Sequence, residues 1–208
     1  MTSLVELLQA SAALHANRLC PKQVLGVRMG LRAARELDLM LPQTDKRLLT
    51  LVETDGCFAD GVSVATGCRI GRRTLRIVDF GKIAAAFVDT HIGRAVRIAP
   101  RLEARDEARR YAPEARSLWE AQLLGYQRIP DEALLSVQAI ALAPPIEQLL
   151  SRPGMKALCE ACGEEIINER QVIRDGAVLC RSCAGEAYYC GVERTRTCPE
   201  AASMLERS

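Results

Sequence analysis

The sequence predicts an α+β core, in which an antiparallel-rich sheet is packed with helices, followed by a small C-terminal cysteine-rich module. Helical and strand patterns are clustered along residues 1–143 instead of alternating, which favours α+β over α/β. Residues 144–156 contain prolines and a Pro-Gly pair that interrupt regular structure, and two Cys-x-x-Cys pairs follow. We therefore expect a core domain over 1–143, a linker over 144–156, the module over 157–192 and a tail over 193–208.

Two helices are predicted at the N-terminus. Over residues 2–17, apolar side chains recur near one side of a helix, as in a segment that docks on a core. After Pro21, apolar side chains repeat every three to four positions over residues 22–40. Gly26 and Gly30 lie one turn apart in this second helix and lower its propensity, so they indicate the close approach of another backbone.

A buried strand and a third helix are predicted next. The strand covers residues 47–54 and is almost continuously apolar. The helix covers residues 57–67, where small side chains indicate tight packing and Gly67 marks the end.

The rest of the core is predicted to contain further strands and helices. Three strand candidates separated by turn signals predict an antiparallel meander, at 74–80, 83–90 and 95–100. Residues 101–127 are predicted to be helical with a break at Pro113, and residues 134–142 to return to the sheet.

The composition limits the classes of function. The formal net charge is +2, from 28 basic and 26 acidic residues, which argues against a general attraction to nucleic acid or anionic lipid. No window has the apolar length of a membrane-spanning helix, and the N-terminus lacks a positive leader followed by an apolar block, so we expect a cytoplasmic protein. Nine cysteines in a reducing compartment point to metal or thiol chemistry before disulfides, although the disulfide reading stays open.

Four of the cysteines form two Cys-x-x-Cys pairs, Cys159 with Cys162 and Cys180 with Cys183. Each pair places two thiolates on one side of a tight turn, and two pairs complete the tetrahedron of a closed Zn²⁺ site. Between them, residues 169–180 predict a hairpin with an Asp-Gly turn, and a short helix is predicted after the second pair. This order is that of a treble-clef zinc finger, in which we expect Zn²⁺ to be structural.

Other roles of the finger are less favoured by its residues. Acidic side chains outnumber basic ones in it, so nucleic-acid binding is not expected. A redox or catalytic role is expected much less than a structural one. Cys190 and Cys198 are left over as free thiols.

The core contains Cys20, Cys57 and Cys68. Cys20 and Cys57 are each predicted to lie at the start of a helix, where backbone N–H groups and the helix dipole favour the thiolate. Asp60, three residues after Cys57, would share a helix face with it. Cys68 would be about 16 Å from Cys57 along a straight helix, too far for both to ligate one ion.

Three blocks of the core resemble one family: "CPKQVLGVRMG", "ETDGCFADGVSVATGC" and "GRRTLRIVDFGK". Together with the double knuckle they resemble the FmdE family, named after a component of formylmethanofuran dehydrogenase, in the form that carries an auxiliary treble-clef finger. The resemblance covers about residues 10–190. It implies an α+β core that is often a homodimer, a metal-binding cleft lined by the Cys-Pro helix start and the acid block, and an accessory role to a molybdenum or tungsten enzyme.

Carried over by position, the resemblance assigns Cys20 to the Cys-Pro cysteine, Cys68 to the Thr-Gly-Cys cysteine, and the acid block to Glu53, Asp55, Cys57 and Asp60. The chain departs from the family where histidines usually precede the Cys-Pro pair. Ala16 and Arg18 occupy those positions, and His15 lies five residues before Cys20. His15 could join the site only if the intervening chain bends back, and it is equally well read as a surface or packing residue.

These observations lead to three hypotheses of function. The first is a metal-binding protein with a structural zinc and a cleft for a second metal or small ligand, with the candidate residues His15, Cys20, Cys57, Asp60 and Cys68. The second is a thiol-dependent redox or transferase enzyme that uses Cys57 or Cys20. The third is an interaction or regulatory protein that docks through its finger. We favour a binding or accessory protein over a stand-alone enzyme.

Overall fold

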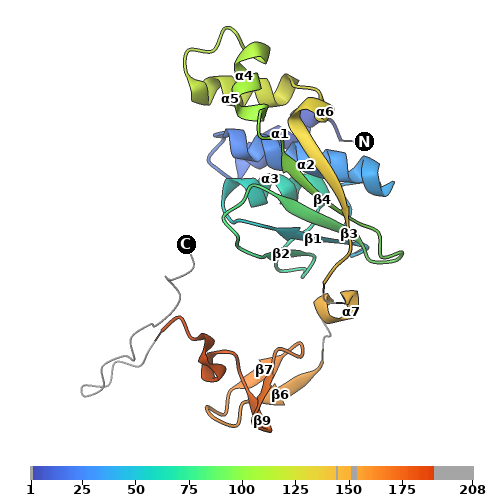
Figure 1. The fold of residues 1–208 in the computed structure, drawn as a ribbon, viewed down its shortest axis with the longest axis vertical. Helices are drawn as coiled ribbons and strands as arrows, with labels where there is room; N and C mark the ends of the chain where they lie inside the picture. Colours follow the sequence, from blue (N-terminus) through green and yellow to red (C-terminus); the bar gives the residue numbers. More distant parts are fainter. Residues whose placement is uncertain (1, 144, 151–153, 190–208) are drawn as a thin grey trace, which may run out of the picture. The chain divides into compact units, whose positions relative to one another are not determined.

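The structure is a computed structural model that describes residues 2–143, 145–150 and 154–189. The chain divides into two compact units, Met1–Leu149 and Leu150–Ser208 (Figure 1). Cys190, Cys198 and the predicted tail lie outside the described residues. Among the helices of the described segments, none is long and apolar enough to cross a membrane.

The first unit contains a five-stranded sheet with the strand order β2-β1-β3-β4-β5. All neighbouring strands in it are antiparallel except β1 and β2, which are parallel. This confirms the predicted α+β class with an antiparallel-rich sheet. The strands are β1 (Leu48–Val52), β2 (Leu75–Ile77), β3 (Ala85–Asp89), β4 (Ala95–Pro100) and β5 (Leu135–Ile140).

The predicted meander is wrong at its first strand, because β2 pairs with β1 and not with β3. Helix α3 (Cys57–Thr66) connects β1 to β2 as a crossover, which allows the two strands to be parallel. Residues 78–84 then pass around the end of β1. There the N–H groups of Phe80 and Lys82 donate to the Glu53 carbonyl, and the Glu53 N–H donates to the Ala84 carbonyl. This path places β3 on the other side of β1.

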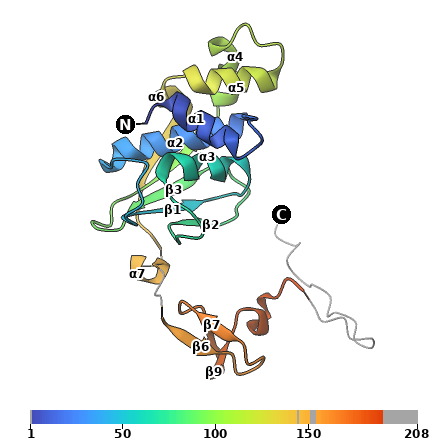
Figure 2. The same cartoon turned by 180° about the vertical axis from the view of Figure 1, so that it is seen from behind.

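Three helices cover one face of the sheet: α1 (Leu4–Ala13), α2 (Pro21–Leu37) and α3 (Figures 1 and 2). On the far side of them from β1 and β2 lie α4 (Ala104–Tyr111) and α5 (Leu118–Arg128), separated by a break that includes Pro113, as predicted. A short α6 (Asp131–Leu134) leads into β5.

Helix α2 is the centre of the core. Its fully buried side chains include Val24, Val27 and Met29, and they belong to one apolar cluster with Phe58 of α3 and Phe87 of β3. Each side chain of this size contributes roughly 1.5–3 kcal/mol when it is buried. The packing between these helices and the sheet therefore fixes where α2 and α3 begin.

A second, smaller apolar cluster lies on the other face of the sheet and includes Leu49, Val88 and Ala95. Ile146 and Leu149 of a short helix, α7 (Ile146–Leu149), pack against this cluster. Part of the stretch predicted as a linker is therefore helical and packs within the first unit.

The second unit consists of two hairpins and a short helical segment. Strand β6 (Lys156–Leu158) pairs with β7 (Glu165–Ile167), and β8 (Val172–Arg174) pairs with β9 (Ala177–Leu179). Asp175 and Gly176 both have positive φ, 51° and 83°, as the predicted Asp-Gly turn requires. A π-helical segment, η1 (Ser182–Glu186), stands where a helix is predicted, and it is interrupted at Gly185.

Candidate functional site

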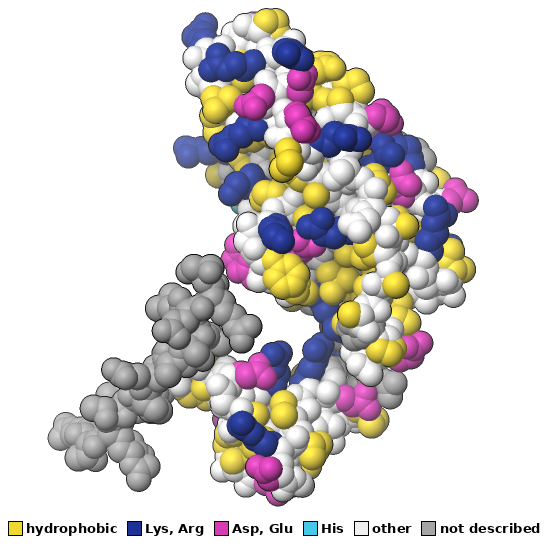
Figure 3. Space-filling model, in the orientation of Figure 1, with side chains coloured by type: hydrophobic (Ala, Val, Ile, Leu, Met, Phe, Trp, Pro, Cys, Tyr) yellow, Lys and Arg dark blue, Asp and Glu magenta, His cyan; other side chains and the backbone are white. Residues whose placement is uncertain are grey.

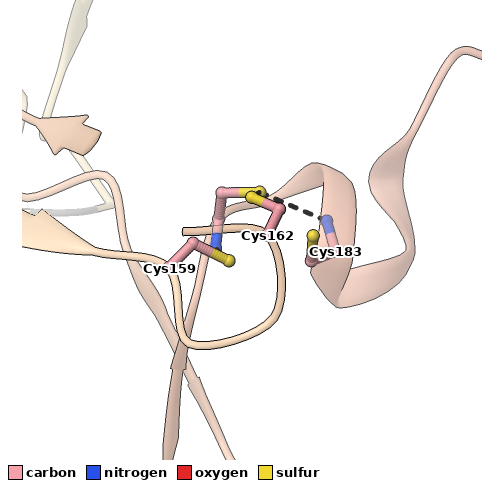
Figure 4. A group of neighbouring side chains, drawn as sticks. Cys159, Cys162 and Cys183 are labelled. Carbon is pink, nitrogen blue, oxygen red and sulfur yellow. Dashed lines mark hydrogen bonds between the residues drawn. The ribbon is translucent and has the colours of Figure 1, made fainter. Parts of the chain in front are cut away.

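The four cysteines of the second unit converge as the two knuckles predict. The Sγ atoms of Cys159, Cys162, Cys180 and Cys183 all lie within 4.8 Å of one another, and Figure 4 shows three of them labelled around one space. A tetrahedral zinc with Zn–S bonds of about 2.3 Å needs sulfur atoms about 3.8 Å apart. The Cys162 and Cys180 sulfurs are 4.0 Å apart. The group therefore fits a structural Zn²⁺.

Backbone N–H groups prepare the sulfurs of this finger for a negative charge. The N–H of Cys180 donates to the Cys159 sulfur at 3.2 Å, and the N–H of Cys183 donates to the Cys180 sulfur at 3.4 Å. The N–H groups of Cys180 and Cys162 lower the pKa of Cys159 to about 6, whereas the thiols of Cys180 and Cys162 raise the pKa of Cys183 to about 12. Four adjacent thiols cannot all ionise by themselves, and a divalent cation removes that conflict.

In the core, Cys20 is the N-cap of α2, with extended backbone dihedrals. Its N–H donates to Oε1 of Gln23 at 2.7 Å, and Nε2 of Gln23 donates to the carbonyl and hydroxyl oxygens of Ser11 in α1. Gln23 is fully buried. The start of α2 is therefore held against α1 by one buried amide.

Cys57 is the first residue of α3 and lies close to Cys20. Burial raises the pKa of the Cys57 thiol, and the Cys20 side chain and the charge of Asp60 raise that pKa further. Its own backbone N–H acts in the opposite direction but does not offset these effects. The expectation of a low-pKa thiolate at Cys57 is therefore wrong, and the hypothesis that this residue is a ready nucleophile loses its support.

Two glycines allow the two helix starts to lie this close. A Cβ atom on Gly26 would be 2.4 Å from the Phe58 carbonyl oxygen, and one on Gly61 would be 2.4 Å from the Gln23 carbonyl oxygen. The contact is reciprocal between α2 and α3, so neither helix tolerates a side chain there. This confirms the prediction that Gly26 marks the close approach of another backbone, and adds Gly61.

His15 joins this part of the core, because the chain after α1 turns back. Ala16 and Asn17 have left-handed backbone conformations, with φ of 51° and 60°. Nε2 of His15 lies 2.8 Å from Oδ2 of Asp60, and both side chains are partly exposed. The described structure thus brings together four of the predicted residues: Cys20 beside Cys57, and His15 beside Asp60 on the next turn of α3.

The structure does not bring Cys68 to this group. Cys68 lies just past the other end of α3 and is 2% exposed. Its sulfur is 3.4 Å from both the Thr50 hydroxyl, which donates to it, and the Leu48 carbonyl oxygen, which accepts from it. Cys68 is therefore part of the apolar core.

Two other residues of the acid block also lie apart from the thiols. Glu53 is buried and accepts from Nε and an Nη of Arg97 on β4, at 2.5 and 2.7 Å. Asp55 is exposed. Arg97 is 44 positions from Glu53 in the chain, so no local pattern could have predicted this ion pair.

Comparisons with known proteins agree with this arrangement. A family model described as "FmdE, Molybdenum formylmethanofuran dehydrogenase operon" matches residues 17–136. The chain belongs to the FmdE family. A second model, the prokaryotic dksA/traR C4-type zinc finger, matches residues 154–189 of this FmdE-family chain and so includes all four finger cysteines.

Two individual proteins are similar to it. A "probable S-adenosyl-L-methionine-binding protein" of Archaeoglobus fulgidus is 30% identical over 93% of this chain, which spans only 56% of that relative's length. The crystal structure of an FmdE-like protein of the tungsten formylmethanofuran dehydrogenase type, from Syntrophus aciditrophicus, matches with a TM-score of 0.59 and 23% identity, over 91% of this chain and 96% of that one. This second likeness shows the shared fold.

The two thiols give a testable difference in reactivity. Because burial and the Cys20 side chain raise the pKa of Cys57, we expect iodoacetamide to modify Cys57 slowly at pH 7 and faster as the pH rises above the usual thiol range. In a Cys20→Ala variant the rate at pH 8 should increase roughly two- to fivefold, the effect of a pKa lowered by about half a unit.

Peptide mass spectrometry after timed alkylation measures this rate. A Cys68→Ala variant is the control and should leave the rate at Cys57 unchanged, since Cys68 lies at the other end of α3. Rapid modification of Cys57 at pH 7 in the unaltered protein would contradict the raised pKa.

Proposed function

We propose that the core of this FmdE-family protein binds a second metal ion through the thiolates of Cys20 and Cys57, in addition to the structural Zn²⁺ of the finger. The single observation that best supports the proposal is the meeting of these two thiols at the starts of α2 and α3. Thiolate ligands select soft and borderline ions such as Zn²⁺. The protein would then act by binding and presenting a metal or a small ligand held by it.

The raised pKa of Cys57 is compatible with this role. Two adjacent thiols hinder each other's ionisation, and a divalent cation between them would compensate both negative charges. Binding would release protons, so the affinity for the metal should rise with pH through the range in which Cys57 ionises.

The pair of His15 and Asp60 supplies the third donor of the proposed site. A carboxylate only accepts hydrogen bonds, so Nε2–H of His15 donates to Asp60, and in the neutral ring Nδ1 keeps a lone pair that can bind a metal. Two thiolates and one imidazole would leave one position open for water or a ligand, unlike the closed site of the finger. In the described part of the chain only the finger cysteines already meet within 4.8 Å, so binding must draw His15 toward the thiols.

A cobalt titration tests this proposal on the full chain with its finger loaded with zinc. Added Co²⁺ should give sulfur-to-cobalt charge-transfer absorption, which a Cys20→Ala/Cys57→Ala variant should lack. The control is Cys68→Ala, a cysteine of the same core that lies apart from the pair. Equal absorption in the double variant, or none in the unaltered protein, would contradict the core metal site.

We further propose that the chain is a homodimeric accessory component of a molybdenum or tungsten oxidoreductase. The support is its membership of a family described by the formylmethanofuran dehydrogenase operon. Affinity capture of the tagged full chain from its native cells should recover a molybdenum- or tungsten-containing partner, and light scattering should give twice the chain mass. Captured material without either metal would contradict the first claim, and a monomer the second.

S-adenosyl-L-methionine is a second candidate ligand of the core, favoured by the name of the Archaeoglobus fulgidus relative. Isothermal titration with this compound tests it directly. Saturable binding to the full chain would support the assignment, and the absence of heat up to about 1 mM would remove it.

A further inference from the structure

The core has a cavity beside the first turn of α2 that the thiol pair does not explain. Its volume is about 360 Å³, within the range of pockets that hold small organic molecules. The walls come from the start of α2, from the end of β4 and the start of α4, and from α5. Pro21, which follows Cys20, is one of its lining residues, whereas Cys20 and Cys57 are not.

The charges around this cavity have one sign. Lys22, Arg101 and Arg105 line it, and none of the described residues that line it is acidic. Nε of Arg101 donates to the Glu132 carbonyl oxygen at 2.7 Å, which leaves its charge uncompensated. In the described part of the chain, neither Lys22 nor Arg105 forms an ion pair. Figure 3 shows Lys and Arg side chains spread over the region of α4 and α5, with apolar side chains between them.

The interior of the cavity is mainly apolar. Leu25 and Tyr126 are buried, and Ile83 and Ala104 complete this surface. Nε2 of Gln122, also in the wall, is buried and has no hydrogen-bond partner among the described residues. An unsatisfied buried donor is costly, and an oxygen of a bound molecule would satisfy it after a small rotation of the amide.

We propose that this cavity binds a small organic anion, in which a carboxylate or phosphate group contacts Lys22 and Arg105 and an apolar group packs on Leu25 and Ile83. Basic side chains at the rim of an apolar pocket are complementary to such a molecule, because the charged group stays partly hydrated while the apolar part is buried. Free inorganic anions lack the apolar part and bind more weakly. The proposal does not depend on a metal at Cys20 and Cys57.

The test uses phenyl phosphate and benzoate as anionic probes and benzyl alcohol as their uncharged analogue, titrated into the zinc-loaded full chain by calorimetry or ligand-observed NMR. We expect at least one anion to bind with a Kd of about 1 mM or tighter, and benzyl alcohol to bind at least about tenfold more weakly. The tighter anion identifies the head group. Raising the salt concentration should weaken binding, because the cations are exposed.

Two matched variants decide whether this cavity is responsible. Lys22→Gln/Arg105→Gln should lower the affinity for the anion about tenfold, because two charge-assisted contacts are lost. Arg94→Gln/Arg109→Gln removes the same charge from exposed positions outside the cavity and should leave the affinity unchanged. Cys20→Ala/Cys57→Ala should also bind normally. Equal affinity in the pocket variant and its control, equal affinity for benzyl alcohol, or no anion binding would overturn the proposal.

Discussion

Replacing Cys159 and Cys180 with serine is expected to unfold the C-terminal unit and to leave the core folded. Among residues 154–189 only Cys159 and Ile166 are buried apolar side chains, so the unit has almost no core of its own. Structural zinc in small fingers has an apparent binding free energy of about 10–16 kcal/mol at neutral pH, and this energy is largely folding energy. Loss of two of four thiolates removes most of it.

Hydrogen exchange followed by mass spectrometry separates the two units in one experiment. Peptides from residues 154–189 should lose protection in the double variant, and also in the unaltered protein after chelation, while peptides of α2 and β3 keep it. An Ala161→Ser variant is the control, because it alters an exposed residue of the same knuckle. Protection of the finger that survives both treatments would contradict a zinc-dependent fold.

Placing alanine at Gly26 or Gly61 is expected to destabilise the core by about 1–3 kcal/mol, which is the usual effect of overpacking. At either position the new Cβ would be 2.4 Å from a backbone oxygen of the facing helix, so α2 and α3 must move apart. Alanine favours a helix over glycine by only about 1 kcal/mol, too little to compensate. The separation would also move Cys20 away from Cys57.

Urea unfolding monitored by circular dichroism measures this effect. A Gly71→Ala variant is the control, since a Cβ there meets nothing within 4 Å. Gly26→Ala and Gly61→Ala proteins as stable as this control would show that the close contact between the helices is unimportant.

Elements with strong local patterns were predictable from the sequence. The helices of the core, the break at Pro113 and the two cysteine knuckles depend on periodicity, proline and short spacings, and all are present. The position of β2 was not predictable in this way. Turn signals at residues 79–82 resemble those of a hairpin, but the chain there passes around the end of β1, and only strand pairing distant in sequence shows it.

The core site was predictable in its members more than in its chemistry. The helix starts correctly indicated Cys20 and Cys57, yet the pKa of Cys57 depends on burial and on a neighbouring thiol 37 positions away in the chain. The return of His15 to Asp60 depends on left-handed conformations at Ala16 and Asn17, which neither residue type requires. Cys68 was harder to place because its hydrogen-bond partners belong to β1.

The metal content per chain tests the account most directly, because the central claim is that the finger and the core hold separate ions. After saturation with zinc and removal of excess, elemental analysis of the full chain should give about two ions, a closed site in the finger and an open one in the core. Cys20→Ala/Cys57→Ala and Cys159→Ser/Cys180→Ser should each retain about one. An unchanged metal content in the Cys20→Ala/Cys57→Ala protein would contradict the account.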